Sequence, residues 1–295
     1  MFTGLSAFPL TPTTENGIDE AAFVRLVSRL AGAGVDSIGA LGSTGGYAYL
    51  SREQRARAAR AAVEAAGTTP VIVGIGALST RQVLDLATDA QAAGAAAVLL
   101  APMTYQPLTD HEVFGLYETV TAELEIPLVV YDNPGTTHVT FSDELHGRIA
   151  ALPNIGSIKI PGIAADNAAA RIAGLRAMVP SHVTIGVSGD WLAAVGLVGG
   201  ADAWYSVLGG LFPETALAIT RAVQSGDVPA AVAASDRLEP LWALFRQFGS
   251  LRVMSAAAET LGLVNSPNLP LPLLGLDPAA RGELEAALTA LGLGA

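Results

Sequence analysis

The sequence predicts an α/β protein, a (β/α)8 TIM barrel with a C-terminal helical extension, on two observations. Eight short apolar runs recur along the chain, and each is closed by Gly, Pro, Ser or Asp and followed by a longer stretch with helical spacing. The eight units occupy about 225 residues, the usual size of such a barrel. An open doubly wound sheet is the alternative, because the number of strands alone does not prove closure.

The predicted strands are almost continuously apolar, which is typical of parallel strands that are buried on both faces. They are "GLSAFPL" from Gly4, "DSIGALG" from Asp36, "PVIVGIG" from Pro70, "AAVLLAP" from Ala96, "PLVVYDN" from Pro127, "IGSIKI" from Ile155, "VTIGVSG" from Val183 and "ADAWYSV" from Ala201.

Helices are expected between the strands because helix-start patterns occur there. Ser51 with Gln54 and Thr109 with Glu112 have the capping-box form, and Ser142 precedes "DELHGRIA". The helix after Ser51 carries a run of arginines that is expected to face solvent or another subunit: Arg52, Arg55, Arg57 and Arg60.

The strand pattern stops after about residue 226. The remaining chain predicts three helices, "AAVAASDRLEPLWALFRQF", "LRVMSAAAETLGL" and "PAARGELEAALTAL". We therefore expect a catalytic barrel over residues 1–225 and a helical extension over residues 226–295 that packs on it.

Charge and composition exclude several classes of partner. A net charge of -11 opposes binding to nucleic acid or to an anionic membrane surface, so the expected partner is a small molecule. The absence of cysteine excludes disulfides, thiolate catalysis and cysteine-bound zinc, and the four histidines show no metal-binding spacing. No apolar run approaches the ~20 residues that span a bilayer, and the first residues lack a targeting pattern, so a cytoplasmic location is expected.

Lys159 is the only lysine among the 16 basic residues of the chain. It lies in the apolar run "NIGSIKIPG", near the end of the sixth predicted strand, where a (β/α)8 barrel forms its active site. The lysine stem could simply pack there while the amine reaches solvent. Alternatively, desolvation could keep the amine neutral and able to form an imine with a carbonyl substrate, which a guanidinium cannot do.

Two further features lie at the same predicted end of the barrel. Tyr131 stands four residues into "PLVVYDNP", as Lys159 does in "IGSIKIPG", so the two side chains share one face of neighbouring strands. A phenol there could move protons for an imine, although a strand tyrosine is more often part of the core. The loop "GSTGG", with Ser43 and Thr44, could hold a carboxylate through its amides and hydroxyls, or it could be only a turn.

Taken together, "GSTGG", "YDNP" and "SIKIPG", in this order and separation, resemble the Schiff-base aldolase family typified by dihydrodipicolinate synthase and N-acetylneuraminate lyase. The "PLTP" and "VSGD" segments fit the same family, so the resemblance covers the barrel and, by length, the extension. It implies a homotetramer or homodimer that binds a 2-oxo acid, usually pyruvate, without metal or organic cofactor. It also implies that Lys159 forms the Schiff base, Tyr131 relays protons, Ser43 and Thr44 hold the carboxylate, and Tyr205 lines the site, largely through its backbone.

The chain departs from the family pattern at several positions. Gly46 replaces a glutamate, Met103 and Thr104 replace a tyrosine pair, Thr136 stands near the position of an arginine, and Trp191 replaces an acidic residue of the sialic-acid lyase. Tyr105 and His138 are the nearby residues that could supply the missing groups.

The sequence thus predicts a class I lyase, most directly an aldolase with pyruvate as donor or product and an aldehyde as partner. Three alternatives stay open: a dehydratase of a 2-keto-3-deoxy sugar acid, a dihydrodipicolinate synthase of lysine biosynthesis, and a non-catalytic protein that binds a keto acid.

Overall fold

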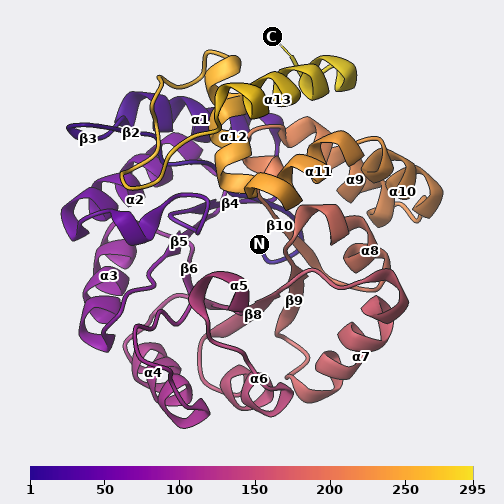
Figure 1. Cartoon of the computed structure of the whole chain (residues 1–295). Coiled ribbons are helices and arrows are strands. Elements are labelled where there is room, and N and C mark those ends of the chain that lie inside the picture. The colour runs from indigo at the N-terminus through magenta and orange to yellow at the C-terminus, as the bar shows by residue number, and fades with distance from the viewer. Residues whose placement is uncertain (295) are drawn as a thin grey trace.

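The computed structural model, which describes residues 1–294, contains a closed barrel of eight parallel strands (Figure 1). The barrel closes because β1 pairs with both β4 and β10. Closure confirms the predicted (β/α)8 fold and excludes the open sheet. The barrel strands are β1 (Gly4–Ala7), β4 (Ser37–Ala40), β5 (Val71–Gly74), β6 (Ala97–Leu100), β7 (Leu128–Tyr131), β8 (Ile155–Ile160), β9 (Thr184–Val187) and β10 (Ala203–Ser206).

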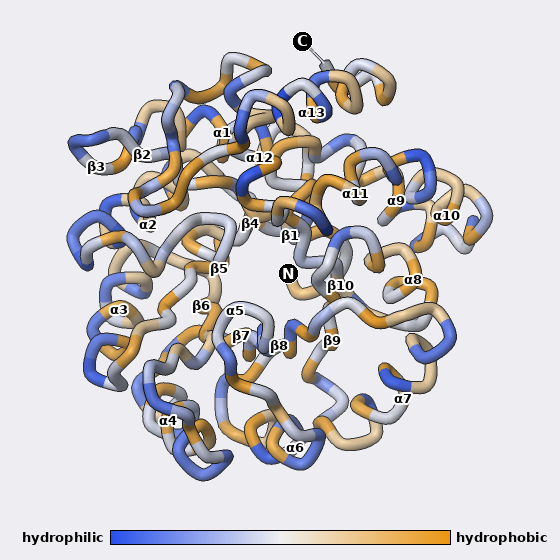
Figure 2. Tube along the Cα trace, in the orientation of Figure 1, coloured by the Kyte–Doolittle hydropathy of each residue, from blue (hydrophilic) through white to orange (hydrophobic). Residues whose placement is uncertain are grey.

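A ring of helices surrounds the barrel, and hydrophilic segments gather on the outer side of the ring (Figure 2). Ser51 and Thr109 close the two predicted capping boxes, and the Ser142 side chain accepts from the backbone of Leu145. The ring helices are α1 (Glu20–Ala33), α2 (Arg52–Ala66), α3 (Thr80–Ala92), α4 (Asp110–Ala122), α6 (Asp143–Ala150), α7 (Ala168–Met178), α8 (Ala193–Val198) and α9 (Pro213–Gln224).

Several short elements that the sequence pattern did not show lie in the connections that follow the strands. They are too short to produce a recognisable periodicity. They comprise the hairpin β2 (Thr13–Thr14) and β3 (Gly17–Ile18), the one-turn helix α5 (Pro134–Thr137), and the 3-10 turns η1 (Tyr47–Tyr49), η2 (Ala165–Asn167), η3 (Asp190–Leu192) and η4 (Leu208–Gly210).

The C-terminal extension contains four helices within the described residues, so the prediction of three is wrong. The first predicted helix divides at Leu238, and Pro240 stands in the first turn of the second half. Proline has no N–H to continue the helical bonds but fits the start of a helix. The helices are α10 (Val228–Asp236), α11 (Glu239–Phe248), α12 (Ser250–Thr260) and α13 (Pro278–Leu291).

Two apolar clusters fill the protein. The larger cluster lies between the barrel and the helices, and the smaller one fills the barrel interior with side chains such as Ile72, Leu99 and Val129. Tyr131 and Tyr205 belong to the interior cluster, so both side chains point into the barrel. None of the helices in residues 1–294 combines the length and the apolar character that a membrane crossing needs. The cytoplasmic location stays a prediction.

Candidate active site

Tyr131 and Lys159 are direct partners in the pairing of β7 with β8, as their shared position in the two strands predicted. The backbone N–H of Asp132 donates to the Lys159 carbonyl at 3.0 Å and continues the pairing to the C-terminal end of both strands. The Lys159 Nζ atom lies 4.0 Å from the centre of the Tyr131 ring. The parallel register therefore places an amine and a phenol side by side where barrel enzymes carry their active sites.

Lys159 is only 4% exposed, and this burial sets its protonation. Desolvation lowers the pKa of Lys159 to about 7, although the buried carboxylate of Asp190 acts in the opposite direction. An ordinary lysine, with a pKa of about 10.4, is almost wholly protonated at neutral pH. Here a large fraction of the amine is neutral near pH 7 and can attack a carbonyl carbon.

Two more aromatic rings face the amine, and one of them was not anticipated from the sequence. Nζ lies 4.1 Å from the ring centre of Phe8 and 5.6 Å from that of Tyr205. Glycines make room for both rings: a Cβ at Gly39 would lie 2.3 Å from Phe8, and one at Gly186 would lie 2.3 Å from Tyr205. Phe8 follows β1 in "GLSAFPL", where an aromatic residue is hard to distinguish from ordinary core.

The Tyr131 hydroxyl faces the "GSTGG" loop. Its Oη atom lies 3.5 Å from Ser43 Oγ, and Asn133 Nδ2 donates to the same Ser43 oxygen at 3.4 Å. Burial raises the pKa of Tyr131 to about 12, against the smaller opposing effect of these hydrogen bonds. Tyr131 is therefore a neutral phenol, able to donate a proton to a leaving oxygen.

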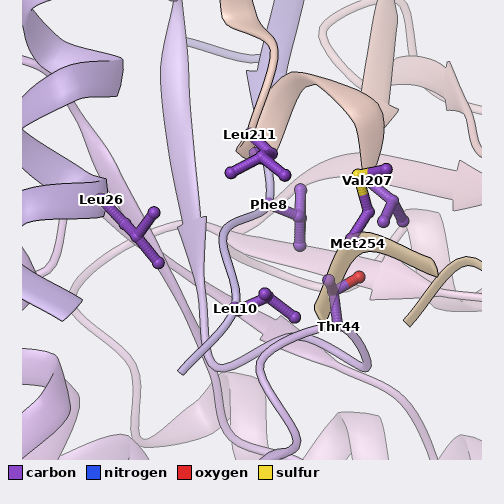
Figure 3. A pocket seen from close by; sticks show the side chains of 8 residues that line it. Phe8, Leu10, Leu26, Thr44, Val207, Leu211 and Met254 are labelled. Atoms are coloured by element: carbon purple, nitrogen blue, oxygen red, sulfur yellow. The ribbon is translucent and has the colours of Figure 1, made fainter. Parts of the chain in front are cut away.

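Thr44, the other loop residue singled out from the sequence, lies beside the aromatic ring of Phe8. It lines a narrow apolar pocket together with Phe8, Leu10 and Met254 of α12 (Figure 3). The pocket is too narrow for a water molecule, so it is a packed contact between the loop and the extension. Met254 therefore places α12 at the same pocket as the loop that carries Ser43 and Thr44.

Tyr205 directs its ring toward Lys159, whereas the resemblance gave its backbone the larger role. Its hydroxyl donates to Ser157 Oγ at 2.7 Å, and Ser157 in turn donates to the Thr184 carbonyl at 3.2 Å. Burial raises the pKa of Tyr205 above its ordinary range. Because the hydroxyl is engaged with Ser157, only the ring of Tyr205 is directed at the amine.

Asp190 is a buried carboxylate whose role the sequence pattern "VSGD" did not reveal. It accepts hydrogen bonds from Trp204 Nε1 at 2.8 Å and from the backbone N–H of Leu208 at 2.9 Å. Burial raises the pKa of Asp190, while these donors stabilise its charged form. Asp190 holds the turn after β10 through these hydrogen bonds, and its negative charge acts to raise the pKa of Lys159.

Arg55 does not face solvent or another subunit, so that expectation is wrong for this member of the α2 run. Among residues 1–294 it is the only arginine that is buried, and its guanidinium donates to the carbonyls of Gly74 and Gly76, both at 2.9 Å. It also lies over the Tyr47 ring, 5.1 Å from the ring centre. Desolvation lowers the pKa of Arg55 to about 10, which leaves it charged at neutral pH.

The connections between each strand and the next helix hold no lysine or arginine anywhere in the described chain. The arginines lie on helices or helix caps instead, and the Arg55 guanidinium is bound to strand carbonyls. Thr136, near the position of the family arginine, is exposed, as are His138 and Tyr105, the latter 89% exposed. The loops at the C-terminal end of the barrel thus present no lysine or arginine side chain within residues 1–294.

Metal-binding clusters of three or more His, Asp or Glu side chains do not occur in the part of the chain that the structure describes. The titratable side chains placed at this end of the barrel are the Lys159 amine, the Tyr131 and Tyr205 phenols and the Asp190 carboxylate.

A desolvated lysine beside a neutral phenol, at the C-terminal end of a (β/α)8 barrel, defines the class I lyases, which act through an imine. Comparison with known proteins confirms this class and the predicted resemblance. The chain belongs to the dihydrodipicolinate synthetase family, whose model matches residues 1–291.

Individual relatives align over almost the whole chain. The 4-hydroxy-tetrahydrodipicolinate synthase of Hyphomonas neptunium is 33% identical over 99% of both chains. The crystal structure of a dihydrodipicolinate synthase from Agrobacterium tumefaciens is 47% identical, with a TM-score of 0.95 over 98% of both chains. The Acinetobacter baumannii dihydrodipicolinate synthase, solved as a complex with pyruvate, is 27% identical, with a TM-score of 0.91 over 99% of this chain and 100% of that one.

Proposed function

We propose that this protein is a Schiff-base lyase that acts on a 2-oxo acid, with pyruvate as donor or product. The observation that carries the proposal is the buried amine of Lys159, with its pKa lowered to about 7, 4.0 Å from the ring of Tyr131. The pyruvate complex of the Acinetobacter baumannii relative supports the choice of donor. The imine itself serves as the electron sink, so the reaction requires no metal or organic cofactor.

We assign a separate role to each of the other residues predicted for the site. Ser43 and Thr44 hold the carboxylate of the keto acid through loop amides and hydroxyls. Tyr131, whose hydroxyl contacts Ser43, relays protons between that substrate and Lys159. Tyr205 forms the wall of the site with its ring, 5.6 Å from Nζ.

The reaction follows from this arrangement. The neutral amine of Lys159 attacks the C2 carbonyl carbon of pyruvate, and the Tyr131 phenol protonates the C2 oxygen as it leaves as water. The resulting iminium withdraws electrons from the neighbouring C3 carbon, which loses a proton and becomes a nucleophilic enamine. The enamine then adds to an aldehyde; in the cleavage direction the same steps run in reverse.

The absence of cations from the loops favours a partner that carries no carboxylate of its own. A neutral or hydroxylated aldehyde meets this condition. So does the dehydration of a 2-keto-3-deoxy sugar acid, in which the same iminium acidifies C3 and no aldehyde is bound. Both reactions place the single substrate carboxylate at Ser43 and Thr44.

Condensation of pyruvate with aspartate semialdehyde is therefore expected to be poor, although relatives bear the name of that synthase. The carboxylate of the aldehyde lacks a charge-assisted bidentate partner near Thr136. Such a loss costs ~2 to 4 kcal/mol, or roughly two to three orders of magnitude in kcat/KM. A coupled assay against neutral aldehydes measures the ratio. Efficient synthase activity would reinstate the lysine-biosynthesis function.

A panel of 2-oxo acids tests the proposed function as a whole. Each acid is incubated with the protein and borohydride, covalent labelling is measured by intact mass, and labelling acids are then assayed for turnover with candidate aldehydes. Labelling by pyruvate followed by turnover supports the lyase. Labelling by none of the acids contradicts it, and labelling without turnover of any partner favours the non-catalytic protein.

We also propose that the protein assembles as a homotetramer or homodimer. The connections after β5 and β6 leave large apolar groups uncovered in the single chain, with Leu78 62% and Tyr105 89% exposed. We expect sedimentation at micromolar concentration to show a dimer or tetramer. A monomer at that concentration would contradict the assembly, and Tyr105 could then contribute to no site on another subunit.

The proposal includes the organisation of the chain into a catalytic barrel and a C-terminal extension. Residues 1–225 form the catalytic barrel that holds the site residues, and the extension assigned to residues 226–295 packs on it over its described part, residues 226–294. The contact between Met254 and the pocket beside Thr44 supports this division, because it gives the extension a role in holding the carboxylate loop.

A further inference from the structure

Three aromatic rings from three different strands or strand ends enclose the Lys159 amine: Phe8 after β1, Tyr131 on β7 and Tyr205 on β10. We call these three side chains the aromatic box. Nζ lies over their faces at 4.1, 4.0 and 5.6 Å from the ring centres, respectively. All three distances are within the ~6 Å at which a ring face attracts a cation.

The box belongs to a fixed part of the barrel. Phe8 is 2% exposed and packs against the Cα positions of Gly39 and Gly42, and it meets the edge of Tyr205 in a T-shaped contact at 6.0 Å between ring centres. Neither glycine could be replaced by a larger residue without displacing the Phe8 ring. The face of Phe8 is therefore held over Nζ by packing.

Phe8 has no polar atom, so its effect on the amine acts through exclusion of water and through its π face. These two effects have opposite consequences for a positive charge. Exclusion of water disfavours it, whereas the negative face of the ring attracts it. Water stays excluded from both the iminium and the neutral enamine. The ring faces and the nearby charges therefore determine how strongly the positive charge of the iminium is stabilised.

The charged and titratable groups around Nζ are few. Asp190, in η3 after β9, acts on Lys159 through its negative field. Tyr131 and Tyr205 stay neutral because burial raises the pKa of each. Asp132, at the end of β7, contacts Lys159 through its backbone N–H, and its side-chain Oδ2 atom lies 3.4 Å from Nε2 of His146. None of the ion pairs among residues 1–294 involves Lys159.

We propose that the aromatic box, and Phe8 in particular, stabilises the positive charge of the iminium formed on Lys159. This inference rests on the proposed function, because it concerns the intermediate of that reaction. The charge appears when the amine adds to C2 and the C2 oxygen leaves with two protons as water, so that nitrogen keeps a double bond to carbon. It disappears when C3 loses a proton and the electron pair moves to nitrogen, giving the neutral enamine.

The exchange of pyruvate methyl protons for deuterium isolates these two steps. The wild-type protein in D2O with pyruvate, followed by proton NMR, reports iminium and enamine formation without any aldehyde. Phe8→Leu removes the ring but keeps an apolar side chain, and we expect it to slow exchange by about tenfold or more. Phe2→Leu is the matched control, because Phe2 packs on the barrel interior at Gly156, at the opposite end of β8.

Fluorinated phenylalanines at position 8 keep the shape of the ring while they weaken its negative face. We expect the logarithm of the exchange rate to fall in step with fluorine number, reaching about tenfold for 3,4,5-trifluorophenylalanine. This series remains informative if Phe8→Leu does not fold. An exchange rate that is unchanged across the series overturns the role of the box. If wild-type protein shows no exchange and no borohydride adduct, the proposed function itself has failed.

Discussion

Lys159→Arg is expected to abolish turnover, with a loss of at least about 10⁴-fold in kcat, while the barrel stays folded. Arginine keeps the positive charge and most of the apolar stem, but its guanidinium stays protonated and cannot attack a carbonyl carbon. The measurement is kcat on any 2-oxo acid that wild-type protein turns over. Retention of full activity would reassign Lys159 as a structural or anion-binding residue.

The control for Lys159→Arg must separate lost chemistry from lost structure. The guanidinium is bulkier than the amine, and the aromatic box is tightly packed, so the variant could lose about 1 to 3 kcal/mol of stability. Lys159→Met is the companion variant because it is neutral and close in length. Both variants should keep the near-ultraviolet circular dichroism of the wild-type protein and should be equally inactive.

Tyr131→Phe is expected to lower kcat by ~10² to 10⁴-fold, the range typical of losing a general acid–base group. The substitution removes the hydroxyl near Ser43 but keeps a ring 4.0 Å from Nζ, so the surroundings of the amine are preserved. Imine formation should be slower but still detectable by borohydride trapping. Single-turnover kinetics with pyruvate would separate the two steps.

The matched control is Tyr49→Phe in η1, because Tyr49 is 48% exposed and its hydroxyl can exchange its bonds with water. We expect that variant to behave as wild type. If Tyr131→Phe also retained kcat within a factor of about three, the proton relay would have to be assigned to another group. Tyr47, whose ring lies beside Arg55, would be the next phenol to substitute.

The barrel could be predicted from sequence because each of its strands is a short apolar run with its own turn residues. The places where prediction failed are local. The predicted helix over residues 230–248 contains Pro240, which fits the first turn of a helix but not its interior, and the structure shows the break at Leu238. The β2 and β3 hairpin has only two residues in each strand, below the length at which alternation is visible.

The sequence likewise predicted some residues of the site and missed others. Lys159 and Tyr131 were found because a single lysine in an apolar run is conspicuous and because strand periodicity fixes the side on which both lie. Phe8 was missed because its role depends on contacts with residues far along the chain. Arg55 was misassigned since helical spacing alone does not show that its guanidinium reaches the carbonyls of Gly74 and Gly76.

The most direct test of the central claim is the location of the covalent adduct that pyruvate and borohydride leave on the protein. Because Lys159 is the only lysine, the N-terminal amine is the one other primary amine that could be labelled, and peptide mass mapping separates the two. We expect wild-type protein to gain one reduced pyruvyl group on the peptide that contains Lys159, and Lys159→Arg to gain none there. An unmodified Lys159 peptide from active wild-type protein would contradict the Schiff-base mechanism.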